Sequence, residues 1–313
     1  MNILYTCDDN YVWLMGISVI SLFENNQNIN EMTVYLLGEK VKDKNKQIKG
    51  RKIKKKGILV ASFGTTYIST REKTIGAIEE KIAKAFPDFE VRRAFTSSMV
   101  RKRILKNEGI HVDDVDEALS KMKEEGFEEV YVASLHIIAG HEYKKVSHSI
   151  NRFKDDFKVI KGAKPLLYSK AHYDEAVDAI AKLMPELREN EALVLMGHGS
   201  DHAANAAYVM LYHMLERNPL TSHVYLGTVE GYPEAEDILE ELEGQGYEKL
   251  YLLPFMIVAG DHAINDMASD EEDSWKSFFE SNGYCVEPIL KGLGEFEPIS
   301  EMFIKRLKDS MYI

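Results

Sequence analysis

Residues 246–263 read GYEKLYLLPFMIVAGDHA and repeat residues 126–143, GFEEVYVASLHIIAGHEY. A second pair of stretches matches in the same way, ILVASFGTT at 58–66 and LVLMGHGSD at 193–201. The separation between matching stretches along the chain is too long for a solenoid, whose repeats measure roughly 20–50 residues. The sequence therefore predicts two homologous halves with a cleft between them.

Each half alternates apolar runs with amphipathic stretches. The run ILVASFG (58–64) is continuously apolar up to its final residues, which is typical of a strand buried on both faces of a parallel sheet. Ile75, Ile78 and Ile82 then fall on one face of a helix. We therefore expect an α/β fold made of two similar, doubly wound halves with parallel sheets, residues 57–190 and 191–313. Seven further strands are expected at 90–95, 130–135, 157–160, 193–196, 223–227, 250–254 and 284–288.

The first 56 residues follow a different pattern. MNILYTCDDNYVWLMGISVISLFENN (1–26) reads as a strand, a turn and an amphipathic helix, and a second strand is expected at 32–37. Residues 1–39 are therefore predicted to form a short βαβ fragment. Residues 40–56 contain ten Lys or Arg and one Asp, so charge repulsion predicts an extended linker.

Composition limits the classes of function. A chain of 313 residues with 45% hydrophobic content can bury a large core, and its net charge of −12 argues against nucleic acid as a partner. Cys7 and Cys285 form no CxxC motif, which fits a reducing compartment. The longest apolar run, 11–23, follows acidic residues and is too short to span a bilayer. We expect a cytoplasmic protein with no membrane partner.

Histidines and carboxylates follow several of the predicted strands. His198, Glu230 and His262 follow strands of the second half, while His136 and Glu142 follow one strand of the first half. Because ligands bind beyond the carboxyl ends of strands in open α/β sheets, we expect these side chains to meet between the halves. Two imidazoles and a carboxylate suit Co²⁺, Ni²⁺, Fe²⁺ or Zn²⁺, and three protein ligands leave positions open for chemistry.

Simpler interpretations exist for each of these residues. A single histidine at a strand end has roughly a one-in-five chance of being a metal ligand, and a structural hydrogen-bonding role is commoner. Asp261 or Asn265 could orient His262 through a hydrogen bond. A phosphate-binding loop is the competing site, but neither GxGxxG nor GxxxxGK[ST] occurs, so no nucleotide is expected.

Six stretches together resemble a known family, the anaerobic sirohydrochlorin cobaltochelatases of the cobalamin pathway. They lie in the family's order within about residues 56–310, and the longest is the most specific. The stretches are GILVASFGTTY, RRAFTSSMVRKRI, SLHIIAGHEYKK, LMGHGSDHAANAAY, TVEGYPEAEDIL and FMIVAGDHAINDMASDEEDSWK. The resemblance implies a class II chelatase, similar in fold to ferrochelatase, that inserts cobalt(II) into sirohydrochlorin without ATP.

The resemblance also implies roles for individual residues. His198 and His262 match the two active-site histidines of the family, and Glu230 matches the third metal ligand. Glu142 falls on a further catalytic carboxylate. His141 departs from the pattern, because an acidic residue is expected before Glu142.

The implied substrate carries eight carboxylates, so an acidic enzyme must offer cations locally. Arg101 and Arg103 lie just past a predicted strand end, and we expect one of them to contact these carboxylates. His136 is a third candidate for substrate binding. The simpler interpretation of the arginines is a solvated helix face.

Other functions stay open. The same scaffold would suit an iron or nickel chelatase acting on a related tetrapyrrole, or a non-catalytic carrier of metal or tetrapyrrole. Residues 1–26 resemble the opening of family 8 glycosyltransferases, but no acceptor domain follows. A truncated βαβ fragment would expose a strand edge, which either the chelatase body or a second chain could cover, so a homo-oligomer is one expectation.

Overall fold

The computed structural model describes residues 2–6, 33–37, 47–49 and 55–312. The chain divides into two compact units, residues 1–55 and residues 56–313, and each is described by itself. Within the described part of the chain, none of the helices combines the length and the apolar composition that a bilayer crossing needs.

In the first unit, β1 (Asn2–Thr6) and β2 (Thr33–Leu37) pair in parallel, as the βαβ prediction requires. The helix predicted between them lies outside the described residues. The segment predicted as a linker contains a strand, β3 (Gln47–Lys49), which pairs antiparallel with β2. Backbone hydrogen bonds to the open edge of β2 give this segment a partner that its charge pattern does not reveal.

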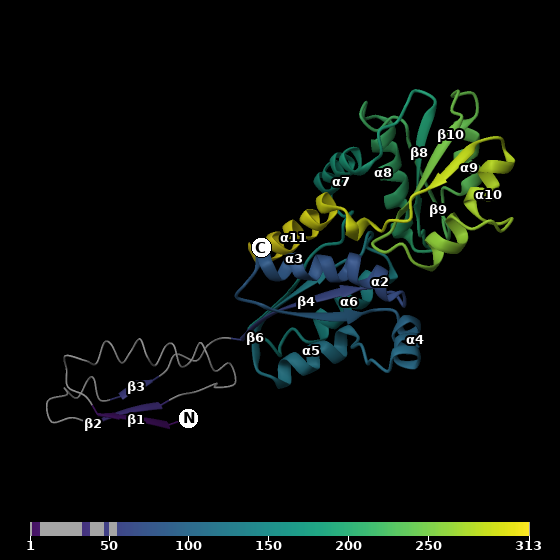
Figure 1. Cartoon of the computed structure of the whole chain (residues 1–313). Coiled ribbons are helices and arrows are strands. Elements are labelled where there is room, and N and C mark those ends of the chain that lie inside the picture. Colours follow the sequence, from purple (N-terminus) through teal and green to yellow (C-terminus); the bar gives the residue numbers. More distant parts are fainter. Residues whose placement is uncertain (1, 7–32, 38–46, 50–54, 313) are drawn as a thin grey trace. The chain divides into compact units, whose positions relative to one another are not determined.

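The second unit contains two four-stranded parallel sheets, shown in Figure 1. The first sheet has the order β5-β4-β6-β7 and the second has the order β11-β10-β8-β9. The same strand order therefore recurs in both halves, which agrees with the two similar halves predicted from the sequence. The strands are β4 (Lys55–Ser62), β5 (Glu90–Phe95), β6 (Phe127–Ser134), β7 (Val159–Gly162), β8 (Glu191–Gly197), β9 (Val224–Thr228), β10 (Lys249–Phe255) and β11 (Cys285–Pro288).

Helices follow the strands in both halves. In the first half these are α2 (Ile68–Arg71), the π-helix η2 (Glu72–Gly76), α3 (Ala77–Ala85), α4 (Ser98–Glu108), α5 (Val115–Glu124) and α6 (His141–Arg152). After β7 and through the second half they are α7 (Lys170–Leu183), η3 (Ala203–Asn205), α8 (Ala206–Glu216), α9 (Ala235–Leu242), η4 (Ala263–Met267), α10 (Trp275–Ser281), η5 (Leu293–Glu295) and α11 (Glu297–Tyr312).

Both faces of the first sheet are buried. Ile58 and Val60 of β4 join the core cluster that contains Ile78 of α3, whereas Leu59 and Ala61 join the cluster built from α5 and α6. Burying an aliphatic side chain of this size contributes about 1.5–3 kcal/mol. Packing on both faces explains why the run is continuously apolar rather than alternating.

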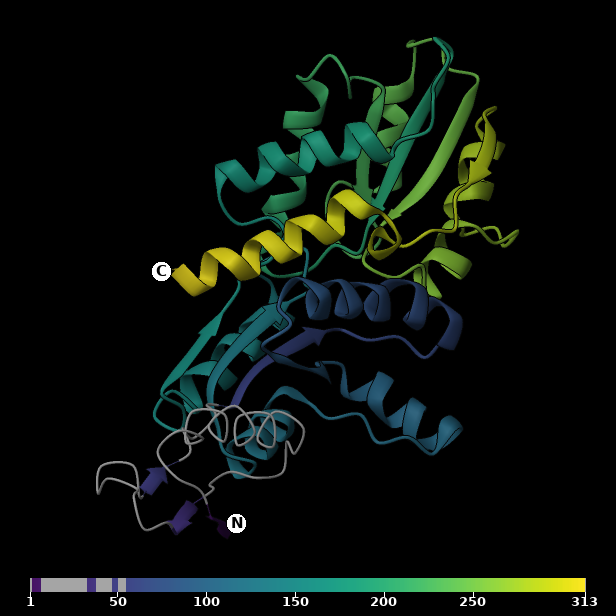
Figure 2. The same cartoon turned by 60° about the vertical axis from the view of Figure 1, so that its left-hand side comes forward.

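The last helix ties the halves together. α11 follows the last strand of the second half but packs against α3, β6 and β7 of the first half, and also against α7. Figures 1 and 2 both show it running beside α3, in yellow. The larger core cluster accordingly contains strands of both sheets together with α11. The two halves therefore share one continuous core.

Candidate functional site

Three potential ligands converge at the carboxyl edge of the second sheet. His198 follows β8 directly, Glu230 lies just after β9, and His262 lies beyond β10, in the helical turn at the start of η4. One ligand atom from each lies within 4.8 Å of the other two, which is close enough to share one metal ion. The two imidazole rings meet edge to face, with centroids 4.7 Å apart and an interplanar angle of 83°.

The expectation that these side chains meet between the halves is wrong for the three potential ligands, which meet within the second half. β8 lies between β9 and β10 in a single sheet, so the loops after all three strands meet within the second half. Their counterparts in the repeat carry other chemistry. By the alignment of the repeated stretches, Phe63 corresponds to His198 and Glu142 corresponds to His262.

Hydrogen bonds fix which imidazole nitrogen is available. Nδ1 of His198 lies 3.0 Å from the carbonyl oxygen of Gly199, and Nδ1 of His262 lies 2.5 Å from a carboxylate oxygen of Asp266. A carbonyl and an ionised carboxylate only accept, so each Nδ1 carries the proton. Nε2 of each ring therefore keeps a lone pair for a metal, the arrangement usual for metal-ligating histidines.

The residue that orients His262 differs from the sequence prediction. The carboxylate comes from Asp266, four residues on, and not from Asp261 or Asn265. Residues four apart lie on the same side of a helical turn, so Asp266 reaches the ring of His262 while Asn265 donates to Asp261 at 3.1 Å. The i, i+4 spacing was the signal that could have identified Asp266.

A glycine allows the loops after β8 and β9 to approach closely. Gly199 has a positive φ of +79°, and a Cβ there would lie 2.6 Å from the backbone nitrogen of Gly231. The amide of Glu230 donates to the carbonyl oxygen of His198 at 2.8 Å. Direct backbone contact thus holds two of the three potential ligands in register.

His136 is buried and fully engaged. The residue is only 8% exposed. Its Nδ1 lies 2.8 Å from the hydroxyl of Ser134, and its Nε2 lies 3.4 Å from the hydroxyl of Thr96. Burial lowers its pKa to about 4, so the ring is neutral near pH 7. Neither nitrogen is free for the substrate contact predicted from the sequence, and the contacts instead join β6 to the end of β5.

Glu142 lies in the first turn of α6, beyond the end of β6. Burial acts to raise its pKa, but the ion pair with Lys145 at 2.5 Å and a hydrogen bond from Thr96 outweigh it, so the pKa lies below the usual value. Glu142 is therefore ionised at neutral pH. Its neighbour His141 contacts Asp201 of the second half, with Nε2 and a carboxylate oxygen 2.9 Å apart.

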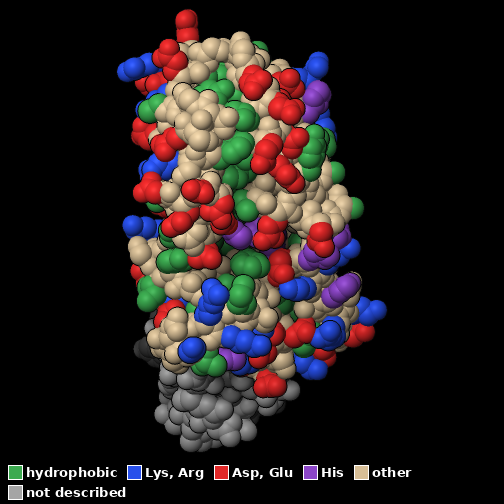
Figure 3. Space-filling model, turned by 90° about the vertical axis from the view of Figure 1, so that its right-hand side faces the viewer, with side chains coloured by type: hydrophobic (Ala, Val, Ile, Leu, Met, Phe, Trp, Pro, Cys, Tyr) green, Lys and Arg blue, Asp and Glu red, His purple; other side chains and the backbone are tan. Residues whose placement is uncertain are grey.

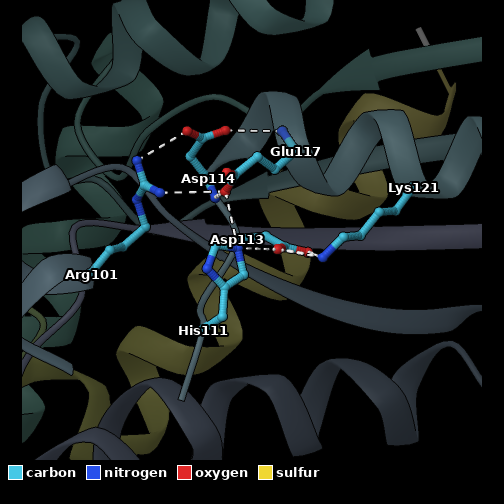
Figure 4. A network of polar contacts seen from close by, with 6 residues as sticks. All are labelled: Arg101, His111, Asp113, Asp114, Glu117 and Lys121. Atoms are coloured by element: carbon cyan, nitrogen blue, oxygen red, sulfur yellow. Dashed lines mark hydrogen bonds and ion pairs between the residues drawn. The ribbon is translucent and has the colours of Figure 1, made fainter. Parts of the chain in front are cut away.

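The two arginines predicted to bind substrate differ in their surroundings. Arg101 is held by Asp114 at 3.0 Å and by Glu117 at 3.4 Å, within the network drawn in Figure 4. It would have to leave two carboxylates to bind a third. Arg103 is exposed, and its charge acts on the hydroxyl of Tyr67, the residue before α2, although burial and Asp261 raise the pKa of Tyr67 overall.

The network in Figure 4 includes a second group with ligand atoms close together, namely His111, Asp113 and Glu117. Lys121 already lies 2.6 Å from Asp113, and Arg101 lies beside Glu117. These side chains supply the positive charge that a metal would bring. The network fastens α4 to the start of α5 and is not a second metal centre in our interpretation.

Large apolar side chains are exposed around the strand ends of both halves. Their exposed fractions lie between 37% and 58%, and they comprise Phe63, Tyr67, Ile68 and Met99 in the first half and Tyr232 and Ile264 in the second. Figure 3 shows a face on which histidine, acidic and hydrophobic side chains are interspersed, with lysine and arginine gathering toward the first half. Such a surface suits a flat ligand with apolar faces and an anionic edge.

Comparison with known proteins decides the family. The model of the family described as cobalt chelatase (CbiK) matches residues 56–312. The sirohydrochlorin cobaltochelatase of Salmonella typhimurium is 42% identical over 257 residues, which cover 82% of this chain and 97% of that protein. The chain belongs to the cobalt chelatase (CbiK) family. The sequence-based recognition of this family is thereby confirmed.

Other relatives of this cobalt chelatase family member agree. The sirohydrochlorin cobaltochelatase CbiKC of Nitratidesulfovibrio vulgaris is 35% identical over 256 residues, covering 81% of this chain and 89% of that protein. The structure of SirB from Bacillus subtilis with Fe³⁺ superposes with a TM-score of 0.56 at 14% identity, covering 82% of this chain and 95% of that one. The latter likeness concerns the fold alone, and it confirms the predicted chelatase-like α/β architecture.

Gly199→Ala should disturb the site through its backbone. The added Cβ would press on the loop of Glu230, and we expect Co²⁺ affinity to fall about 10- to 100-fold, the range seen when groups that orient metal ligands are removed. Titration of the protein with Co²⁺, followed by visible absorbance, measures this. Gly126→Ala is the matched control, because Gly126 has a similar φ of +78° with open space around it. Equal losses in both variants would contradict the steric explanation.

Burial of His136 predicts a specific loss of stability in acid. Its folded pKa of about 4 lies below the ordinary value of 6.5, so below pH 6.5 the unfolded chain binds a proton that the folded chain refuses. The free energy of unfolding should then decrease as the pH is lowered, by about 2 kcal/mol from pH 7 to pH 5 from this group alone.

The variant His136→Gln isolates that contribution, because glutamine does not titrate. Urea denaturation at pH 7 and pH 5 should show wild type losing about 2 kcal/mol more than the variant. Parallel losses in the two proteins would contradict the assignment of a low pKa to His136.

Proposed function

We propose that this protein inserts cobalt(II) into sirohydrochlorin without ATP. Two of its relatives are named sirohydrochlorin cobaltochelatases. The observation that carries the proposal is the convergence of one ligand atom from each of His198, Glu230 and His262 within 4.8 Å of the others. Two nitrogens and one oxygen suit a borderline divalent ion and leave coordination positions open. Identity of 42% to a cobaltochelatase over nearly its full length supports cobalt as the metal and sirohydrochlorin as the ring.

The metal is a substrate in the proposed reaction, so the protein ligands bind it only transiently. His198, His262 and Glu230 replace water ligands of the arriving ion while one face of it stays open toward the ring. The Nδ1–H groups are anchored to Gly199 and Asp266, so each ring presents the same nitrogen throughout. Transfer to the macrocycle exchanges these protein ligands for ring nitrogens.

Insertion also releases two protons from the ring nitrogens, and these need acceptors. When the ion leaves, the Nε2 atoms of His198 and His262 regain free lone pairs and can each accept a proton. Glu142, ionised and located in the first half, offers a second kind of acceptor. The balance is one Co²⁺ and one doubly protonated ring in, one metallated ring and two protons out.

We assign binding of the tetrapyrrole ring to the exposed residues around the carboxyl ends of the strands. The exposed apolar side chains there can contact the ring faces, and Arg103 can pair with a peripheral carboxylate. Arg101 is the weaker candidate because its guanidinium already binds Asp114 and Glu117.

Iron or nickel is the alternative metal, since the same ligand set binds all three ions. A competition assay with Co²⁺, Fe²⁺ and Ni²⁺ under anaerobic conditions distinguishes them. A carrier that never inserts metal would bind Co²⁺ without producing the absorption spectrum of the metallated ring.

The proposal concerns residues 56–312. The resemblance of residues 1–26 to family 8 glycosyltransferases stays a prediction, because the family model begins only at residue 56. Location in the cytoplasm, assembly into a homo-oligomer and the absence of nucleotide and nucleic-acid partners likewise stay predictions.

Removing either imidazole should stop the reaction. His198→Ala and His262→Ala each delete one metal ligand, and we expect the rate of cobalt insertion to fall by more than about 100-fold, beyond the losses typical of outer-shell groups. The measurement is the absorbance of the metallated ring in an anaerobic assay. His213→Ala removes an exposed histidine on α8 and should keep full activity. Full activity in either site variant would refute the assigned site.

Arg103 should act on ring binding and not on the metal. Arg103→Ala should raise the KM for sirohydrochlorin about threefold to tenfold, as expected for a partly solvated ion pair, with an unchanged KM for Co²⁺. Lys102→Ala, an exposed cation on the same helix, is the matched control. Equal effects of the two changes would indicate a general effect of charge and not a contact.

A further inference from the structure

A tyrosine from the first half reaches the loop that carries His262. The hydroxyl of Tyr67 donates to a carboxylate oxygen of Asp261 at 3.2 Å. The loops themselves are adjacent, because a Cβ built on Gly260 would lie 3.7 Å from the hydroxyl oxygen of Thr65. This contact links the segment between β4 and α2 of one half to the segment after β10 of the other.

The backbone holds Tyr67 in place for this contact. Its amide donates to the hydroxyl of Thr65 at 3.3 Å, and its carbonyl accepts from the amide of Arg71, since Tyr67 caps the start of α2. The side chain is 38% exposed, so core packing does not explain its direction. What fixes the hydroxyl is Asp261.

Asp261 stands directly before His262, at the start of the π-helix η4. Asn265 donates to the same carboxylate oxygen of Asp261 at 3.1 Å. Asp266 holds the ring of His262, whereas Tyr67 and Asn265 hold the residue that precedes it in the chain. The position of the imidazole therefore depends on groups from both halves, although all three potential metal ligands belong to one.

We propose that Tyr67 is a positioning residue, whose hydroxyl acts through Asp261 to place His262 for metal binding and transfer. This inference rests on the proposed metal site and deepens it. Tyr67 belongs to the half that does not carry the three potential ligands, so its hydroxyl can align His262 through the contact between the halves. Misplacement of a reacting group by about 1 Å can cost about 100-fold in rate.

The test variant is Tyr67→Phe, which removes the hydroxyl and keeps the aromatic ring. We expect Co²⁺ affinity, measured by titration without tetrapyrrole, to fall about tenfold, the lower end for a hydrogen bond to a charged group. The rate of insertion at saturating ring should fall as well, while the KM for sirohydrochlorin changes little. Tyr168→Phe, at an exposed tyrosine outside this contact, should match wild type in both measurements.

A double-mutant cycle separates positioning from general damage. If Tyr67 acts through Asp261, Tyr67→Phe should have no further effect on Co²⁺ affinity in an Asp261→Ala background. Additive losses, or unchanged Co²⁺ affinity in Tyr67→Phe, would overturn the inference. If Tyr67→Phe lowers the midpoint of thermal unfolding, the Asp261→Ala variant alone provides the test. Unchanged Co²⁺ affinity in Asp261→Ala would also overturn the inference. Lack of cobalt insertion by wild type would instead refute the proposed function.

Discussion

The site depends on one geometric constraint, the parallel pairing of β9, β8 and β10. Parallel strands bring their carboxyl ends to the same edge, so the loops after three neighbouring strands must meet there. His198, Glu230 and His262 each occupy one of these loops. The buried, apolar strands supply rigidity, and Gly199 supplies the close backbone approach that brings the first two loops together. The three potential ligands therefore need no proximity in the sequence, because adjacent strands bring them together.

Duplication followed by divergence explains the asymmetry of the two halves. Both sheets have the same strand order, yet the first half carries Phe63 where the second carries His198, and Glu142 where the second carries His262. One half thus presents nitrogen ligands, and the other presents an apolar ring and a carboxylate at equivalent positions. A flat macrocycle that receives a metal on one face would also need two different protein surfaces, one that carries the metal ligands and one that does not. The shared core around α11 holds those surfaces in one unit.

The strands and the three potential ligands were predictable because local patterns encode them. Continuous apolar runs such as 58–64 identify buried parallel strands, and polar residues directly after them identify the functional edge. Side-chain partners were not predictable in the same way. Arg101 looked available for substrate until the structure paired it with Asp114, and Asp261 looked like the partner of His262 until it proved to bind Tyr67. Such pairings depend on tertiary contacts that no local pattern records.

The two substrates of the proposed reaction carry opposite charges, so they require opposite electrostatic surroundings in the protein. A protein of net charge −12 attracts a divalent cation and repels a ring with eight carboxylates. Local arrangement resolves this conflict, because acidic groups surround the metal ligands while cations such as Arg103 lie on the first half. The hydrogen bonds on Nδ1 hold both imidazole rings in a fixed orientation. In the proposed reaction, the same two histidines that bind the metal are freed as it passes to the ring, when two ring protons must leave, so they could also accept those protons.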